Sequence, residues 1–141
     1  MKTNIDDVSG ASNGDGLRLP VTLRAAGAEG ADRTSAFVAH LGAAAAGSVL
    51  VRNEGGYVAR FTLTYSLDGH EFTQESGDIT LGVNKSAWIP AGATEIQLKV
   101  EENIGWAWST IFTKSYAVPT TVCFKVWGTT LFPAWAAINC G

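Results

Sequence analysis

The feature that most constrains the fold of this chain is a regular alternation of side chains across Tyr57–Tyr65. Apolar residues recur at every second position, namely Tyr57, Ala59, Phe61, Leu63 and Tyr65. Most of the positions between them are polar, namely Arg60, Thr62 and Thr64. Because successive side chains of a strand point to opposite faces, this period of two predicts a strand with one buried face.

Similar patterns recur along the chain after residue 47. Residues 48–52, 95–101 and 121–127 are predicted strands, and Ile79, Leu81 and Val83 alternate in the same way. Turn-forming residues separate these runs, among them an Asp68-Gly69 pair that is typical of a tight hairpin. Short strands at this spacing predict an all-β fold, an antiparallel β-sandwich over residues 48–141.

Residues 1–47 are predicted to form a short N-terminal extension packed on the sandwich. Its first part is rich in turn residues, and residues 17–24 alternate as a short strand. Pro20 places that strand at a sheet edge, since proline cannot donate to a central ladder. Residues 34–46 are the helix candidate, because Thr34 or Ser35 can cap the alanine run that follows.

Composition and charge exclude some classes of partner. The chain has 141 residues, 46% of them hydrophobic and 16% charged, which is typical of one globular domain. A net charge of −3 favours neither nucleic acid nor an anionic membrane surface as a partner. The polar, acidic N-terminus does not have the pattern of a signal peptide, and the sequence leaves the compartment and the oligomeric state open.

The two cysteines, Cys123 and Cys140, leave two interpretations open. A disulfide between them would fix the end of the chain to a predicted strand. Two reduced thiols are equally compatible with the sequence, because the redox state depends on the compartment.

Residues that could carry catalysis or bind a metal are sparse. The two histidines, His40 and His70, lie in no cluster with metal-ligand spacing. Glu101 and Glu102 are adjacent, so on a strand they point to opposite faces and cannot work as a carboxylate pair. No phosphate-binding loop or nucleophile elbow is present either, so we predict a binding protein without metal or cofactor, not an enzyme.

An aromatic segment without charge, residues 103–112, follows the predicted strand at 95–101. A turn that only reverses the chain is normally rich in Gly, Asn, Asp or Pro. This one carries Ile104, Trp106, Trp108 and Phe112. Such a segment either folds back under the domain or contacts another molecule.

Three stretches resemble the C-terminal membrane-binding β-sandwich of the cholesterol-dependent (thiol-activated) cytolysins. Residues 56–61 are similar to the family's Gly-Ala-Tyr-Val-Ala-Gln-Phe strand. Residues 90–96 run without a gap into 102–112, where the family has the undecapeptide Glu-Cys-Thr-Gly-Leu-Ala-Trp-Glu-Trp-Trp-Arg. Residues 126–133 are close to the family's Trp-Gly-Thr-Thr-Leu-Tyr-Pro. Their common order over residues 48–133 makes the resemblance specific.

The resemblance implies a sterol-binding site at Thr130 and Leu131, which match the family's Thr-Leu recognition pair. The undecapeptide matches at Glu102, Gly105, Ala107 and Trp108 but departs from the family at other positions. Asn103 stands for the cysteine, Trp106 for a leucine, Thr110-Ile111 for the later tryptophan pair and Phe112 for the arginine. This pattern suits membrane binding better than the triggering of a pore.

We therefore predict a non-catalytic module that binds membrane lipid, with cholesterol as the implied sterol. Residues 1–47 are too few for the family's pore-forming domain, so the chain is expected to act within a multi-chain toxin or as a stand-alone recognition protein. The predicted contact residues are Thr130, Leu131, Phe132, Ile104, Trp106 and Trp108. The alternative is a module on the same scaffold that binds a carbohydrate or protein receptor without lipid contact.

Two local questions stay open in the sequence. Leu131 and Phe132 either cap the end of the sandwich or form an exposed tip. Trp106 and Trp108 would share one face if their segment stayed extended, and in a sandwich that face is often core. Trp88, Trp127 and Trp135 are predicted to be mainly structural.

Overall fold

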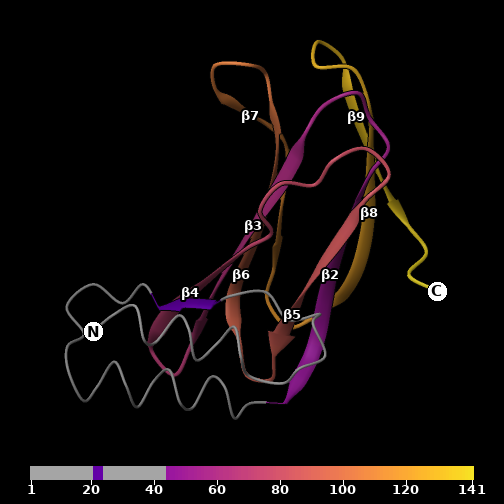
Figure 1. The fold of residues 1–141 in the computed structure, drawn as a ribbon. Coiled ribbons are helices and arrows are strands. Elements are labelled where there is room, and N and C mark those ends of the chain that lie inside the picture. Colours follow the sequence, from indigo (N-terminus) through magenta and orange to yellow (C-terminus); the bar gives the residue numbers. More distant parts are fainter. Residues whose placement is uncertain (1–20, 24–43) are drawn as a thin grey trace.

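The computed structural model describes residues 21–23 and 44–141, and these residues form β-strands arranged as two packed sheets (Figure 1). We name the sheets A and B. In strand order, sheet A comprises β1 (Val21–Leu23), β4 (His70–Glu75), β3 (Ala59–Leu67), β6 (Thr94–Asn103) and β7 (Trp108–Tyr116). Sheet B comprises β5 (Asn84–Pro90), β2 (Ala45–Asn53), β8 (Thr121–Gly128) and β9 (Pro133–Ile138). The predicted all-β sandwich is confirmed.

The core lies between the two sheets and follows the period of two. The apolar face predicted for the strand at Tyr57–Tyr65 is buried along its whole length, and β6 buries Ile96, Leu98 and Val100 in the same way. Across the gap, Phe112 of sheet A packs on Phe124 of sheet B with ring centroids 5.0 Å apart. Each such side chain contributes about 1.5–3 kcal/mol when it is removed from water.

The Asp68-Gly69 hairpin is confirmed. Leu67 pairs with His70, so the connection between β3 and β4 has two residues. Both have positive φ, 54° at Asp68 and 79° at Gly69, as a tight turn matched to the strand twist requires.

Strand pairing differs from the prediction at one place. β2 and β8 are parallel, with Val49 opposite Val122 and Val51 opposite Phe124, whereas the other pairs are antiparallel. Alternation within one strand specifies which side chains are buried but not which strand lies beside it. A local sequence pattern therefore cannot predict a parallel neighbour that lies far along the chain.

The predicted helix is wrong at its C-terminal end. Ala45 and Ala46 are the first residues of β2, and Ala45 pairs with Pro90 of β5. The ladder to β5 overrides the helix propensity of alanine. The next residue is Gly47, where β2 approaches the backbone of Thr120 so closely that any side chain at this position would overlap the Thr120 backbone.

Most of the N-terminal extension lies outside the described residues, including the rest of the predicted helix and Pro20. The described part of the predicted edge strand, Val21–Leu23, is β1, and it pairs with β4 at the edge of sheet A. The division into an extension of residues 1–47 and a sandwich of residues 48–141 stays a prediction.

A disulfide joins Cys123 and Cys140, with Cα atoms 5.3 Å apart. Cys123 is buried in β8, and Cys140 lies just beyond β9. The bridge therefore fixes the last residues of the chain to the middle of sheet B. Of the two interpretations that the sequence leaves open, the structure shows the bridged one.

Removing this bridge is expected to destabilise the sandwich. Its loop spans 17 residues, for which the loss of chain entropy in the unfolded state corresponds to about 3 kcal/mol. Urea unfolding of the oxidised protein should therefore show a free energy of unfolding about 3 kcal/mol above that of Cys140→Ala. Adding a reducing agent should bring the wild type to the level of the variant, and an unchanged wild type in reductant would contradict the prediction.

Candidate functional site

Two loops project from the same end of the sandwich, one from each sheet (Figure 1). The β6–β7 loop comprises residues 104–107 and the β8–β9 loop residues 129–132. The β2–β3 connection ties them together at their base. The Gly56 N–H donates to the Gly128 carbonyl at 3.0 Å, and the Asn103 N–H donates to the Val58 carbonyl at 2.9 Å. We call this end of the molecule the loop end.

Asn53, at the end of β2, organises the base of the loop end although it is polar and fully buried. Its side-chain amide donates to the Tyr57 carbonyl at 2.6 Å and to the Ile79 carbonyl at 2.8 Å. Its side-chain oxygen accepts from the Gly55 N–H at 2.8 Å. A buried amide with this many partners fixes the connection rather than weakening the core.

The β6–β7 loop presents Trp106 to solvent. The loop closes through a hydrogen bond from the Ile104 N–H to the Ala107 carbonyl at 2.9 Å. The Gly105 N–H donates to the side chain of Asn103 at 2.7 Å, and Gly105 has a φ of 108°, a value that favours glycine. Trp106 is 84% exposed, and Ile104 in the same loop is half-buried.

Trp108 lies apart from Trp106, because the segment turns in the loop and does not stay extended. Val100 pairs with Phe112 but Glu101 pairs with Thr110, so Ile111 is an extra residue in β7. This bulge shifts the alternation and places Trp108 on the outer face of sheet A. There the Arg60 guanidinium lies 3.9 Å from the ring centroid, and Arg60 also pairs with Glu101 at 2.9 Å. Trp108 is a half-buried surface residue, not a core residue.

The β8–β9 loop is a tight turn with an apolar tip. The Phe132 N–H donates to the Thr129 carbonyl at 3.1 Å. Leu131 is 81% and Phe132 79% exposed, and Thr130 is exposed beside them. Neither apolar side chain caps the sandwich, so the exposed tip is the interpretation that the structure supports.

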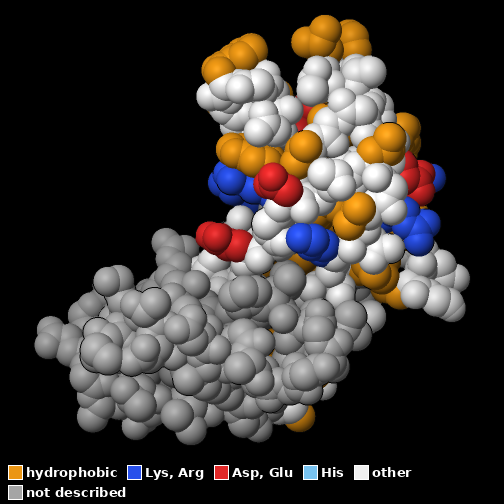
Figure 2. Space-filling view, in the orientation of Figure 1, with side chains coloured by type: hydrophobic (Ala, Val, Ile, Leu, Met, Phe, Trp, Pro, Cys, Tyr) orange, Lys and Arg blue, Asp and Glu red, His pale blue; other side chains and the backbone are white. Residues whose placement is uncertain are grey.

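Hydrophobic side chains therefore occupy the outer ends of both loops, as Figure 2 shows. The charged side chains visible on this face lie nearer the middle of the molecule (Figure 2). Trp106, Leu131 and Phe132 are the most exposed of the large apolar residues in the described ranges 21–23 and 44–141. The predicted contact residues thus separate into three tip residues, the adjacent Thr130, and two half-buried neighbours, Ile104 and Trp108.

Sequence reasoning missed one further exposed apolar segment at this end. Leu81 is 66% and Val83 37% exposed, in the connection between β4 and β5. The Gly82 N–H donates to the Asn53 carbonyl at 2.7 Å, which places this connection beside the loop end. The predicted strand through Ile79, Leu81 and Val83 is wrong, since only Ile79 forms a bridge, with Ala59. The glycine after Leu81 is the signal that could have identified a turn.

Glu102 is an unusual component of this end, because it is a carboxylate with only 2% of its surface exposed. Its Oε1 atom is buried without a hydrogen-bond partner. Burial raises the pKa of Glu102 above its ordinary value. Burial and the nearby Glu102 charge also raise the pKa of Tyr57 to about 12.

The remaining tryptophans support the sheets. Trp88 is buried, and Trp135 stacks on Phe112 with centroids 4.3 Å apart. Trp127 is partly exposed on the outer face of sheet B, where the Lys125 ammonium lies 5.0 Å from its ring.

Within the part of the chain that the structure describes, no group of His, Cys, Asp or Glu side chains could hold a metal ion. Nor do these described residues include a helix long and apolar enough to cross a membrane.

Comparison with known proteins gives consistent matches. The family model described as the thiol-activated cytolysin beta sandwich domain matches residues 48–134. Tetanolysin of Clostridium tetani (strain Massachusetts / E88) is 28% identical over 102 residues, which cover 62% of this chain and 19% of tetanolysin. The chain thus spans about a fifth of that relative.

Two solved structures share the fold. Listeriolysin O superposes with a TM-score of 0.52 and 22% identity over 67% of this chain and 22% of its own. The membrane-binding domain of pneumolysin gives a TM-score of 0.51 and 24% identity over 66% of this chain and 96% of that domain.

Proposed function

Since the chain belongs to the family of thiol-activated cytolysin beta sandwich domains, we propose that it is a non-catalytic module that docks on membranes through its loop end. The observation that carries this proposal is the exposure of Trp106, Leu131 and Phe132 at one end of the molecule. The pneumolysin domain of the same fold is described as membrane-binding. Exposed apolar groups gathered in this way mark contact sites for membranes or proteins.

The expected strength of docking follows from the size of the tips. Moving a Leu or Phe side chain out of water contributes about 1.5–3 kcal/mol, so the β8–β9 tip alone contributes about 3–6 kcal/mol. A single myristoyl chain, with an association constant of about 10⁴ M⁻¹, anchors a protein only marginally. That constant corresponds to about 5.5 kcal/mol, and adding Trp106 on the second loop brings the total to about 4.5–9 kcal/mol, a range that extends above it. Two loops from different sheets also define the orientation of the domain on the surface.

Within this site we assign sterol recognition to Thr130 and Leu131, the pair that matches the family motif. The Thr130 side chain is exposed next to Leu131, so its hydroxyl can exchange hydrogen bonds with a sterol hydroxyl while Leu131 contacts the ring system. With a net charge of −3, attraction to anionic lipids contributes little. The role that we propose is docking alone, within a multi-chain toxin or as a stand-alone recognition protein.

The sterol assignment predicts that Thr130→Gly/Leu131→Gly loses cholesterol-dependent docking. Loss of the Leu131 side chain alone should weaken binding to phosphatidylcholine–cholesterol vesicles by about 10- to 100-fold. Sedimentation with vesicles that contain or lack cholesterol measures the effect. Val118→Gly is the matched control, because Val118 is 63% exposed in the β7–β8 connection at the opposite end.

Equal sedimentation of wild type and double variant would refute the sterol assignment while leaving apolar docking in place. Wild-type protein that binds no vesicle but binds a glycan array would support the receptor-binding alternative. Val118→Gly should sediment like the wild type.

A further inference from the structure

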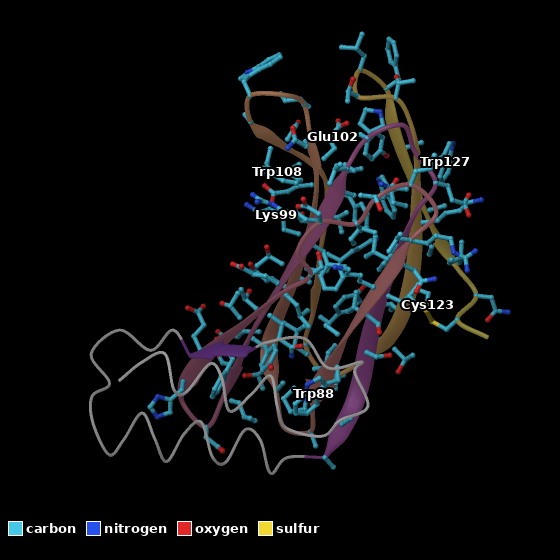
Figure 3. The ribbon with its side chains drawn as sticks, viewed as in Figure 1. Trp88, Lys99, Glu102, Trp108, Cys123 and Trp127 are labelled. Carbon is cyan, nitrogen blue, oxygen red and sulfur yellow. A yellow bond between two sulfur atoms is a disulfide. The ribbon has the colours of Figure 1, made fainter. Side chains whose placement is uncertain are left out.

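Glu102 occupies the inner face of sheet A immediately before the β6–β7 loop. It continues the inward series Ile96, Leu98 and Val100, and its strand neighbours at the same level are Ala59 of β3 and Ser109 of β7. Figure 3 shows the residue below the two projecting loops, between the strands that lead into them. Glu102 precedes Asn103, the last residue of β6, so this carboxylate lies at the base of one of the two loops that we propose contact the membrane.

No cation compensates this carboxylate within the described part of the chain. On sheet A, Arg60 and Lys99 lie on the outer face, where both pair with Glu101. On sheet B, Arg52 pairs with Glu54 and Lys125 covers the Trp127 ring on the outer side. Lys85 donates to the Ser76 carbonyl at 3.2 Å, and the Lys114 ammonium lies 4.9 Å from the Trp135 ring centroid. The interior thus offers Glu102 no ion pair.

Tyr57 is the titratable group that faces Glu102 from the β2–β3 connection. Its hydroxyl donates to the Trp127 carbonyl at 2.9 Å, which commits its single hydrogen. The Glu102 Oε1 atom is buried without a hydrogen-bond donor. A buried carboxylate with neither cation nor donor is satisfied most simply by taking up a proton itself.

We propose that Glu102 takes up a proton when the loop end docks on a membrane, so that docking strengthens as the pH falls. This inference rests on the proposed function and adds a regulation to the same site. A bilayer against the loops displaces water from their base, and loss of water disfavours the charged form of a carboxylate. The already raised pKa of the free protein agrees with this direction.

The direction of the pH effect follows from linkage. If the docked state binds the proton more tightly than the free state, the pKa of Glu102 is higher when docked. The extra affinity is then fully present below the pKa of the free protein and is lost as the pH rises through the pKa of the docked form. Because one proton is involved, affinity changes by at most about tenfold per pH unit.

The adjacent carboxylates supply a matched pair of variants. Glu102→Gln keeps the shape but cannot take up the proton, so its affinity should stay at the low-pH level of the wild type at every pH. Glu101→Gln changes the neighbouring carboxylate on the outer face and should keep the wild-type slope. If Glu102 had only a structural role, Glu102→Gln would change the affinity by the same factor at every pH and would keep the wild-type slope.

The experiment is sedimentation of the full chain with phosphatidylcholine–cholesterol vesicles between about pH 5 and about pH 8. These vesicles carry no net charge, so protonation elsewhere on the protein gains no lipid attraction. The wild type should bind progressively better as the pH falls, and Glu102→Gln should give a flat profile. Near-ultraviolet circular dichroism confirms that each variant is folded.

Three results would overturn the inference. A flat wild-type profile, or a wild-type slope in Glu102→Gln, refutes it and leaves membrane docking intact. A flat profile in Glu101→Gln as well would show that the slope is not specific to Glu102 and would also refute it. Wild-type protein that binds no vesicle at any pH refutes the proposed function together with the inference.

Discussion

Trp106→Ser/Leu131→Ser/Phe132→Ser is expected to abolish vesicle binding without unfolding the protein. The three side chains are 79–84% exposed, so their removal leaves the core unchanged. Each contributes about 1.5–3 kcal/mol on leaving water, or about 4.5–9 kcal/mol together. This corresponds to a loss of affinity of at least about 10³-fold.

Two measurements check this result. Vesicle sedimentation gives the affinity, and the melting temperature should stay close to that of the wild type. Val118→Ser serves as the control for removal of exposed apolar surface, because Val118 lies in the β7–β8 connection away from the loop end. Wild-type affinity in the triple variant would show that the loop end is not the contact surface.

Gly128→Ala is expected to disrupt the β8–β9 loop although it adds a single methyl group. Gly128 has a φ of 96°, which is unfavourable for alanine, and a Cβ atom there would overlap the Phe132 carbonyl oxygen. Strain and overlap together amount to about 2–6 kcal/mol if the loop stays in place. The loop can relieve this only by breaking the hydrogen bonds between Thr129 and Phe132, which displaces the tip.

We therefore expect Gly128→Ala to lose both stability and vesicle affinity, the latter by at least about tenfold. Gly69→Ala is the control, because it introduces similar backbone strain without the steric overlap. Gly69 has a similar φ of 79°, but nothing lies within 4 Å of its added Cβ, and it belongs to the β3–β4 hairpin. Melting curves and sedimentation should show a larger loss for Gly128→Ala. Equal effects on both properties would contradict the proposed role of the loop geometry.

Much of the fold could be predicted from the sequence because its signals are local. The alternation across Tyr57–Tyr65 specified a buried face, and the Asp68-Gly69 pair specified a hairpin that the structure confirms. The contiguous motif at residues 126–133 pointed to Thr130 and Leu131, and both are exposed in the β8–β9 loop. In each of these cases neighbouring residues carry the information, through backbone geometry or a contiguous motif.

The candidate site could be predicted only in part, because exposure depends on what covers a residue. Trp106 and Trp108 are two positions apart, yet the turn of the β6–β7 loop separates them. Trp106 is a solvent-exposed tip residue, whereas the bulge at Ile111 places Trp108 on the outer face of sheet A under Arg60. Leu81 has the pattern of a strand residue but lies in a turn held by Asn53.

The sequence by itself determined the class of fold, the inward faces of its main strands and the family to which it is similar. The tertiary structure decided the parallel pairing of β2 with β8 and the bridge between Cys123 and Cys140. It also decided the burial of the Glu102 Oε1 atom without a hydrogen-bond partner. The physical reason is distance along the chain. Alternation and turn chemistry act between adjacent residues, whereas strand neighbours, the pairing of cysteines and the environment of a buried charge depend on segments that meet only in the folded protein.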